Sequence, residues 1–245
     1  MPKKPKVIVV LPALNAEKTL EKTISDIPKD IVSEVILVDD GSEDDTVALA
    51  RKLNLTVYAH NENIGYGANQ KTCYTIALEK GADIIVMIHP DYQYDPKVIK
   101  YLVGFINEGY CDVMLGSRIR SRKETLDGGM PIYKYFANRF LTFCENVLSG
   151  YNLSEWHTGL RAYKKEVLEN IDFMSNSNDF VFDTEVLFQI VEKKYSIGDI
   201  PIPAKYTAET SSINFRRSLE YGILTLYTAF KFFFKDCIRK ILKKN

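Results

Sequence analysis

The chain has 245 residues, of which 46% are hydrophobic and 26% are charged, and this is the composition of a globular protein with a substantial core. Lys and Arg number 32, and Asp and Glu also number 32, so the formal net charge of zero gives no reason to expect a nucleic-acid partner. The four cysteines form no CxxC pair, which argues against a zinc site and a disulfide framework and favours a reducing cytoplasm.

The N-terminal segment predicts a buried strand rather than a secretion signal. Its apolar run follows several lysines, but Pro12, Asn15 and Glu17 interrupt the run before a signal-peptide core forms. We expect strands at residues 6–11, 34–39, 56–59, 83–88 and 112–116, alternating with helices at 16–27, 44–53, 67–80 and 96–108. This alternation predicts an α/β fold with a doubly wound, mostly parallel sheet, in which ligands bind beyond the carboxyl ends of the strands.

The pattern changes near Ser117 into a loop rich in Arg, Gly and Asp. A helix is expected at residues 132–149 and a strand at 197–206, followed by a long helix with Ser211 or Ser212 as its N-cap. We read this part as a second half of one domain rather than as a separate domain.

Acidic side chains follow the second predicted strand, in the sequence DDGSEDDT. Asp44 is expected to cap the next helix, but capping needs one carboxylate and leaves Asp39 and Asp40 unexplained. A carboxylate at a strand end can accept hydrogen bonds from a ring N–H or a ribose hydroxyl. We therefore predict that Asp39 or Asp40 contacts a nucleotide base or ribose.

The segment NIGYGANQK carries two glycines, but it does not follow the first strand, where a dinucleotide-binding fingerprint belongs, so a dehydrogenase is not expected. Gly65 and Gly67 are predicted to let the backbone approach a nucleotide or to let a helix start tightly. Lys71 is then available to a phosphate, with a plain loop as the alternative interpretation.

Together these motifs resemble the family 2 inverting glycosyltransferases with the A-type nucleotide-sugar fold, and within them the dolichyl-phosphate mannose synthase-like branch. The matching motifs run in family order: Pro12 with Asn15, VDDGSEDDT, NIGYGAN, HPDYQY, GSR and TGLRAY. The resemblance implies transfer of a sugar from a nucleoside diphosphate (UDP or GDP) to an acceptor. It also implies one domain over residues 1–214, with a nucleotide-sugar half at 1–116 and an acceptor half at 117–214. The donor-binding residues that it implies are Pro12, Asn15, Glu17, Asp39, Asp40, Gly41, Gly65, Gly67, Lys71 and His89.

The stretch His89-Pro90-Asp91-Tyr92-Gln93 occupies the place of the family's Asp-x-Asp motif, with His89 replacing the first Asp. A divalent ion held by one or two carboxylates neutralises the charge that develops on a diphosphate leaving group. The resemblance therefore implies Asp91 as a direct ligand of Mg²⁺ or Mn²⁺, with Gln93 and His89 as further candidates. A neutral imidazole suits Mn²⁺ better than Mg²⁺, but His89 could equally contact ribose or phosphate. Asp95 is expected to cap a helix.

The acceptor half carries both cations and a competing carboxylate. A phosphate monoester is largely ionised at neutral pH and needs no base, whereas a sugar hydroxyl does. Cations for a phosphate are predicted at Arg118, Arg120 and Arg161, and Trp156, His157 and Thr158 are predicted to contact the acceptor. Asp91, Arg118 and Glu155 are the catalytic candidates, Glu155 as the base of a hydroxyl acceptor.

We therefore predict transfer to polyprenyl (dolichyl or undecaprenyl) phosphate. The first alternative is transfer to a glycan or other hydroxyl acceptor in cell-surface polysaccharide synthesis. An alternative of another class is a non-catalytic nucleotide-sugar-binding protein, which His89 favours slightly.

The C-terminal segment, residues 215–245, predicts an amphipathic basic helix. Apolar positions recur at Leu219, Gly222, Leu226, Phe230, Phe233, Cys237 and Ile241, and six basic residues follow from Lys231 onward against Asp236. Such a helix suits anionic lipid headgroups, and a homodimer or core-packing helix is the alternative. No transmembrane helix is expected, so the predicted location is the cytoplasm, peripherally associated with the membrane face.

Overall fold

A computed structural model describes residues 4–206 and 215–242. Within them one sheet has seven strands in the order β3-β2-β1-β4-β6-β5-β7. The strands are β1 (Val7–Ala13), β2 (Val32–Asp39), β3 (Thr56–Ala59), β4 (Ile84–Ile88), β5 (Val113–Ser117), β6 (Leu160–Lys164) and β7 (Ile197–Pro201). Neighbours are parallel except where β6 pairs with β4 and β5. The predicted α/β fold with a mostly parallel sheet is confirmed.

Strand β6 was not expected from the sequence. It lies antiparallel between β4 and β5, with Arg161 opposite Met87 on one side and Leu115 on the other. A polar residue at a central strand position, close to Thr158 and Gly159, obscures the apolar run by which strands are recognised. The predicted strand at residues 197–206 is shorter, because regular pairing ends at Pro201 and only the isolated bridge from Tyr94 to Ala204 continues it.

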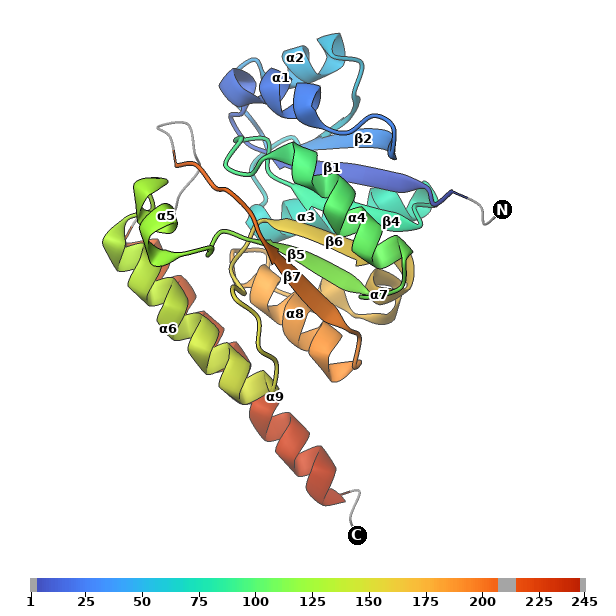
Figure 1. Ribbon diagram of the computed structural model, residues 1–245. Coiled ribbons are helices and arrows are strands. Elements are labelled where there is room, and N and C mark those ends of the chain that lie inside the picture. Colours follow the sequence, from blue (N-terminus) through green and yellow to red (C-terminus); the bar gives the residue numbers. More distant parts are fainter. Residues whose placement is uncertain (1–3, 207–214, 243–245) are drawn as a thin grey trace.

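Both faces of the sheet are buried under helices (Figure 1). Helices α3 (Tyr66–Glu79), α7 (Lys165–Asn170) and α8 (Phe182–Glu192) contribute to one core cluster with Ile8, Ile36 and Ile85. Helices α1 (Glu17–Asp26), α2 (Thr46–Lys52) and α4 (Ile99–Asn107) contribute to the other with Val9 and Leu37. Alternate strand residues thus point to opposite cores, which is why the strands read as continuous apolar runs. Two short 3₁₀ helices, η1 (Pro96–Val98) and η2 (Phe173–Ser175), complete these layers.

Two long helices, α6 (Ile132–Ser149) and α9 (Phe215–Leu242), lie side by side at one edge of the molecule (Figure 1). Thr142 and Glu145 of α6 and Thr225 and Ala229 of α9 are buried. The preceding loop, rich in Arg and Gly, contains the short helix α5 (Arg122–Asp127), which was not predicted. The predicted cap at Ser211 or Ser212 lies outside the described residues.

Helices α6 and α9 each present a row of large apolar side chains to the exterior, on the side opposite their buried residues. We call these two rows the outward apolar face. Its members are exposed at helical spacing: Ile132, Phe136, Phe140, Phe143 and Val147 on α6, and Leu219, Ile223, Tyr227, Phe230, Phe234 and Ile238 on α9. Of the expected row on α9, Leu219, Phe230 and Phe233 are exposed, whereas Gly222, Leu226 and Cys237 are only partly exposed. The exposed row instead includes Ile223, Tyr227, Phe234 and Ile238. Gly222 instead lies against the Leu141 side chain of α6.

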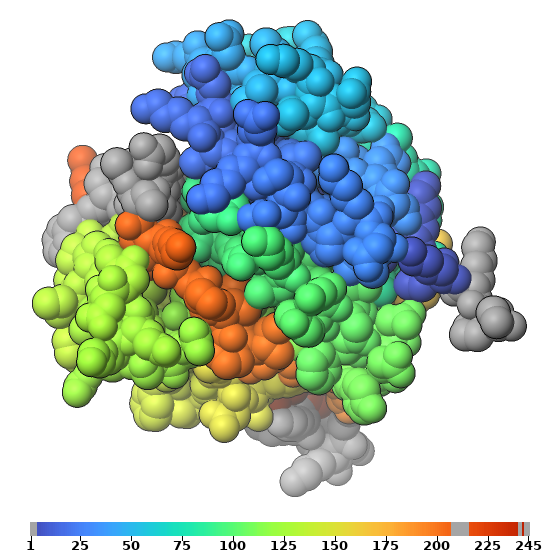
Figure 2. Space-filling model, turned by 45° about the horizontal axis from the view of Figure 1, so that its top comes forward, coloured from blue at the N-terminus to red at the C-terminus, as the bar shows by residue number. Residues whose placement is uncertain are grey.

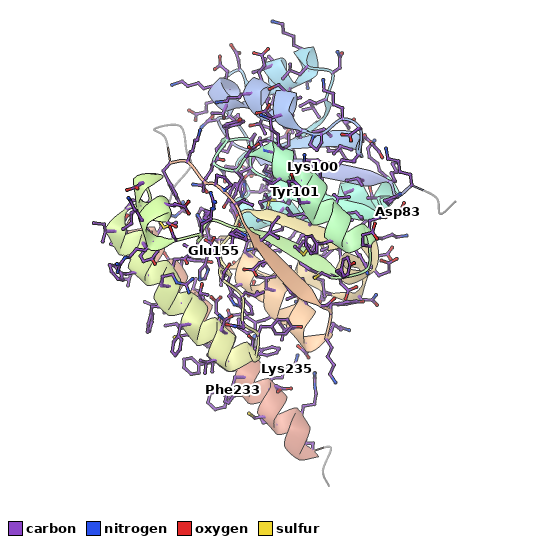
Figure 3. All side chains as sticks on the ribbon, viewed as in Figure 1. Asp83, Lys100, Tyr101, Glu155, Phe233 and Lys235 are labelled. Carbon is purple, nitrogen blue, oxygen red and sulfur yellow. The ribbon has the colours of Figure 1, made fainter. Side chains whose placement is uncertain are left out.

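The basic side chains of α9 are partly engaged by the protein itself. Lys235 and Arg239 both form ion pairs with Glu192 of α8, and Figure 3 labels Lys235 on the exposed part of α9. Lys243 and Lys244 lie outside the described residues. Of the residues described, no helix combines the length and the apolar character that a membrane span requires.

Candidate active site

The two carboxylates at the end of β2 anchor the loops around them. Asp39 accepts hydrogen bonds from the backbone N–H groups of Gly41 at 3.2 Å and Ser42 at 2.9 Å. Asp40 accepts from Ile64 N–H at 3.0 Å and Gly65 N–H at 3.1 Å. Asp39 and Asp40 are 2% and 3% exposed, so this structure gives them a structural role. A direct contact of either with a base or ribose stays a prediction.

The loops after β1 and β2 are joined by hydrogen bonds. Asn15, with a left-handed φ of 51°, accepts from Glu43 N–H at 2.9 Å. The N–H of Ala16 donates to Thr46 Oγ1 at 2.7 Å. Pro12 is buried within β1, whereas the Glu17 side chain is exposed in the first turn of α1. Among these donor-binding candidates, Asn15 and Glu17 border solvent at the carboxyl edge of the sheet.

The glycines of NIGYGAN accommodate protein rather than open space. A Cβ on Gly65 or Gly67 would lie 2.5 Å from the carbonyl oxygen of Asn178 or Ser177, respectively. The carbonyl of Asn178 also accepts from Gly67 N–H at 2.8 Å and so caps α3. Lys71, expected at a phosphate, donates instead to the side chain of Asn178 at 2.7 Å and to a neighbouring carbonyl. This ammonium already has partners and is 8% exposed, so this structure gives Lys71 a structural role, and its contact with a phosphate stays a prediction.

Gly41 has a comparable role at a different loop. Its φ of 79° lies in the left-handed region, and a Cβ there would lie 2.9 Å from the backbone nitrogen of Asn63. Gly41 therefore lets the segment after β2 pack against the segment after β3, and its contact with a donor stays a prediction.

At the end of β4, His89 is held by an aromatic and acidic cluster. Its Nε2 lies 3.1 Å from the hydroxyl of Tyr66, and that hydroxyl donates to Asp183 at 2.8 Å. The Gly159 backbone leaves no room for a side chain, since a Cβ there would lie 2.6 Å from the His89 ring. The ring is thus fixed between α3 and β6.

Asp91 stands next to this cluster, with partial exposure, and accepts from Gln93 N–H at 3.0 Å. The side chain of Gln93 is buried and lies 3.5 Å from Arg118 Nη1. Asp95 caps η1 by accepting from Lys97 N–H at 3.0 Å, as expected. Among the described residues no three His, Cys, Asp or Glu side chains gather into a cation site. One carboxylate at a strand end nevertheless fits an ion whose remaining ligands are diphosphate oxygens.

The centre of the acceptor half is a buried ion pair between Arg118 at the end of β5 and Glu155. Arg118 donates to Glu155 from its backbone N–H at 2.6 Å and from Nε at 2.8 Å, and its Nη2 also contacts the same carboxylate. The pair is 15% and 0% exposed. Asn138 of α6 adds a hydrogen bond to Glu155 at 2.9 Å, and Figure 3 shows Glu155 between the sheet and α6.

This pairing changes the reading of Glu155. Burial alone would raise the pKa of Glu155, but the charge and hydrogen bonds of Arg118 hold that pKa below its ordinary value. A carboxylate that is stabilised as an anion and enclosed by donors is a poor proton acceptor for a substrate. In this structure Glu155 orients Arg118, and its role as the base of a hydroxyl acceptor stays a prediction that this pairing disfavours.

A small cavity lies on the exposed side of Arg118. It has a volume of about 130 Å³ and is lined by Arg118, Arg120, Glu124, Thr125, Ile202, Pro203, Ala204 and Tyr206. Tyr206 accepts from Arg118 Nη1 at 3.0 Å, and Figure 2 shows the segment after β7 (orange) at the surface beside α5 and α6. Burial, and then the charge of Arg118, lower the pKa of Lys134 in the first turn of α6. Arg118 and Arg120 line this cavity together with Glu124, which pairs with Arg120, and Lys134 is close enough for the charge of Arg118 to act on it. We call these three cations the cationic region.

The remaining acceptor candidates are internal. Trp156 is 1% exposed, packs on Phe188 and donates to Asn146 at 2.7 Å, so of its two possible roles, acceptor contact and core packing, this structure shows core packing. Arg161 is fully buried and lies 3.4 Å from the Asp183 carboxylate, which corrects its assignment to a phosphate. Thr158 is fully buried and donates to the carbonyl of Gly116.

His157 connects the site to the helix pair. Its Nε2 lies 3.0 Å from Glu145 of α6, its Nδ1 lies 2.6 Å from the hydroxyl of Tyr221 of α9, and its carbonyl accepts from Arg118. The side chain is 8% exposed, so the expected direct contact with an acceptor gives way to a bridging role.

Sequence reasoning missed Tyr66, Tyr206 and the role of Asp183. Asp183 lies in the first turn of α8, where an acidic residue also suits the helix dipole, yet its carboxylate accepts from Tyr66 and Gln70. Tyr66 stands between the two glycines of NIGYGAN, and in the sequence only the glycines suggest a function for this segment. The partnership of Tyr66 with Asp183 spans 117 positions, which no local pattern reveals.

Replacing Gly67 by Ala tests the assignment of the glycines to protein packing. The new methyl group would collide with the Ser177 carbonyl and Phe182, so we expect a loss of about 1–3 kcal/mol of unfolding free energy in urea titrations. Gly104→Ala in α4 is the matched control, since nothing lies within 4 Å of its Cβ, and it should be neutral or slightly stabilising. Equal effects of the two variants would contradict the packing assignment.

Replacing Glu155 by Gln tests the ion pair. Leaving Arg118 buried without its counter-charge should cost about 3 kcal/mol at pH 7. Because the folded pKa of Glu155 is lowered, its stabilisation is present above the ordinary carboxyl pKa and is lost as pH falls through the folded value. Urea midpoints measured from pH 7 downward should therefore converge for the two proteins. Glu124→Gln, which removes an exposed partner of Arg120 at 3.7 Å, should change stability by less than about 1 kcal/mol.

Comparisons with known proteins identify the family to which a chain with this fold and site belongs. Residues 8–172 match the family described as Glycosyl transferase family 2. An uncharacterised protein of Methanocaldococcus jannaschii is 31% identical over 241 residues, which cover 97% of this chain and 93% of that protein. The UDP-N-acetylglucosamine--dolichyl-phosphate N-acetylglucosaminyltransferase of Methanococcus voltae is 29% identical over 218 residues, covering 82% of this chain and 86% of the relative.

A solved structure shows the same fold. Glucosyl-3-phosphoglycerate synthase of Mycobacterium tuberculosis, in complex with Mn²⁺, uridine diphosphate and phosphoglyceric acid, superposes with a TM-score of 0.73 at 18% identity. The likeness covers 94% of this chain and 78% of that one, and it confirms the expected A-type glycosyltransferase fold. With the family match over residues 8–172, these findings establish that the chain belongs to glycosyl transferase family 2 and is a glycosyltransferase.

Proposed function

We propose that this enzyme transfers a sugar, with inversion, from a nucleoside-diphosphate sugar to a polyprenyl phosphate at a membrane surface. In this proposal residues 1–116 bind the donor, residues 117–214 bind the acceptor, and α9 contacts lipid. The observation that carries it is the outward apolar face, which begins on α6 beside the cationic cavity at Arg118. An enzyme that uses a lipid phosphate requires both features: cations that bind the phosphate group and an apolar surface that contacts the surrounding lipid.

The cationic region suits an acceptor that arrives ionised. A phosphate monoester carries between one and two negative charges at pH 7, so Arg118, Arg120 and Lys134 would attract and orient it. Glu155 is committed to Arg118, which fits a reaction that needs no base at this position. The dolichyl-phosphate named as acceptor of the Methanococcus relative is an acceptor of this class.

At the donor side, Asp91 is the proposed ligand of a divalent cation, either Mg²⁺ or Mn²⁺, with His89 beside it. When bound, such an ion neutralises negative charge on the diphosphate leaving group. Gln93, whose side chain lies near Arg118, would connect the two halves of the site rather than bind the ion directly. Asn15 and Glu17 border the proposed donor site from the loop after β1.

The proposed reaction is one in-line displacement. An acceptor phosphate oxygen forms a bond to the anomeric carbon while the bond from that carbon to the donor diphosphate breaks, and the bonding pair leaves with the diphosphate. Inversion follows because attack and departure occur on opposite faces of the sugar. The residues of the chain contribute position and charge rather than a proton transfer.

We also propose that the enzyme lies against the cytoplasmic face of the membrane through the outward apolar face. Aromatic and aliphatic side chains at such a surface gain free energy when the lipid interface covers them. Arg122 and Lys123 on α5 and Lys231 on α9 are exposed and would add attraction to anionic headgroups.

Asp91→Asn tests the donor side. Removal of the carboxylate should lower transfer from a radiolabelled nucleotide sugar to polyprenyl phosphate by about a hundredfold or more, equivalent to about 2.7 kcal/mol. Asp95→Asn is the matched control, because that side chain caps η1 in the same loop and asparagine also caps. Near-wild-type turnover of Asp91→Asn, with Mg²⁺ or Mn²⁺ supplied, would overturn the assignment.

Replacing Phe136, Phe140 and Phe143 together by Ser tests the membrane side. Each phenyl group that the lipid interface covers contributes up to about 1.5–3 kcal/mol, so binding to phosphatidylcholine vesicles with phosphatidylglycerol should fall at least tenfold in flotation assays. Transfer to long-chain polyprenyl phosphate should fall with it, and transfer to a short, water-soluble analogue should be retained.

The matched control removes exposed aromatic residues from another face. Tyr101 and Phe105 of α4 are 54% and 42% exposed, and Tyr101 lies far from α6 in Figure 3. Tyr101→Ser with Phe105→Ser should leave vesicle binding unchanged. If the α6 variant instead binds vesicles normally but shifts from dimer to monomer in sedimentation experiments, the outward apolar face is a contact between two copies of the chain.

A further inference from the structure

The His89 imidazole is fixed on several sides. Its ring lies against Gly159 of the loop before β6, its centroid is 5.4 Å from that of Tyr66, and its Nε2 lies 3.1 Å from the Tyr66 hydroxyl. Tyr66 is itself stacked near Phe180, with ring centroids 4.7 Å apart. The imidazole can therefore present few of its atoms to a ligand.

The hydrogen-bond inventory of Tyr66 decides which ring nitrogen of His89 carries a proton. A phenol has one proton to donate. Tyr66 donates it to Asp183 Oδ2 at 2.8 Å, so toward His89 its oxygen can act as an acceptor. His89 then donates from Nε2–H, and its Nδ1 keeps a lone pair.

Both carboxylate oxygens of Asp183 accept hydrogen bonds from side chains around it. Gln70 Nε2 donates to Asp183 Oδ1 at 3.1 Å, and the buried guanidinium of Arg161 lies 3.4 Å from Oδ2. Burial, and then the negative charge of Asp183, raise the pKa of Tyr66 well above its ordinary value, so the phenol keeps its proton. Gln70 is fixed in turn by the hydroxyl of Tyr74, which donates to its Oε1 at 2.7 Å.

We infer that Tyr66 and Asp183 are positioning residues that hold His89 as its Nε2–H tautomer, with Nδ1 as the ligand-facing atom next to Asp91. The inference rests on the proposed donor and cation site at Asp91. His89 would then supply a neutral nitrogen ligand at the position where the family's motif has a carboxylate. The Asp183–Tyr66–His89 series then acts as a carboxylate does behind a metal-bound histidine, fixing both tautomer and ring orientation.

The position of this series explains residues that the donor and acceptor assignments leave unused. Arg161 and Asp183 are buried together, and the proposed donor and acceptor contacts make no use of either. Their charge pair sets the direction of the Tyr66 hydroxyl, and through it the direction of His89. A neutral nitrogen at Nδ1 favours Mn²⁺ over Mg²⁺, so the same residues would set the cation preference.

The first test reads the tautomer and needs neither metal nor activity. The chain has 3 histidines, so ring-nitrogen NMR of labelled protein resolves them, and loss of signals in His89→Ala assigns His89. We expect the Nε2–H pattern in the wild type and its loss in Tyr66→Phe. Tyr151→Phe, which removes a phenol that donates to the Tyr195 carbonyl far from His89, should leave the pattern unchanged. An Nδ1–H pattern in the wild type, or an unaltered pattern in Tyr66→Phe, overturns the inference.

The second test asks whether the positioning acts through His89. Mn²⁺ affinity is measured by electron paramagnetic resonance in the presence of uridine or guanosine diphosphate. Tyr66→Phe should weaken it about tenfold in the wild-type background but less than about twofold when His89 is already Ala. Equal losses in both backgrounds would mean that Tyr66 supports the fold rather than His89, and they overturn the inference.

The two tests also separate this inference from the proposed function. If the wild-type protein shows the Nε2–H pattern but binds no Mn²⁺ with either nucleotide, the cation site at Asp91 fails while the positioning of His89 stands. If Mn²⁺ binds and depends on Asp91 but the tautomer does not depend on Tyr66, the positioning role fails and the proposed function stands.

Discussion

The buried ion pair between Arg118 and Glu155 is the interaction on which the acceptor half depends. It joins the end of β5 to the loop before β6, and through Asn138 and the carbonyl of His157 it extends to α6 and toward α9. Burying two charges is expensive unless hydrogen bonds satisfy them, and here each has several. Arg118 is therefore held with little freedom, so in the proposed reaction the acceptor phosphate would meet a charge that is already in position.

In residues 1–116, the proposed donor half, polar side chains likewise fix the loops, here through hydrogen bonds to backbone N–H groups. Asp39, Asp40 and Asn15 use their oxygens to fasten three loops to one another at the carboxyl edge of the sheet. The carbonyl of Asn178 caps α3 and brings residues from the acceptor half beside Gly65 and Gly67. Polar residues that the sequence suggests for ligand binding thus mainly hold the loops around the candidate site in place.

This explains which features could be predicted from the sequence. Strands β1, β2, β4 and β5 are apolar runs buried on both faces, so periodicity and length identify them. Strand β6 could not be recognised because Arg161 occupies its centre, and a charge becomes tolerable there through Asp183, which lies 22 positions away in the chain. Arg118 and Asp91 lie at strand ends, as their motif positions predict, and their functional roles stay proposals. The protein partners of Trp156, Lys71 and Glu155 could not be predicted, because a sequence shows that a side chain can bind but not which distant neighbour it contacts.

The placement of β6 has a consequence for how the polypeptide is made. Strand β6 separates β4 from β5, although β4 and β5 both precede it in the chain. While the ribosome synthesises the protein, β4 and β5 have no partner between them until residues 160–164 have emerged. These strand edges remain unpaired while α6, which carries a row of exposed apolar side chains, is being synthesised. Completion of the sheet must therefore be late and dependent on distant contacts, which exposes unpaired strand edges during synthesis.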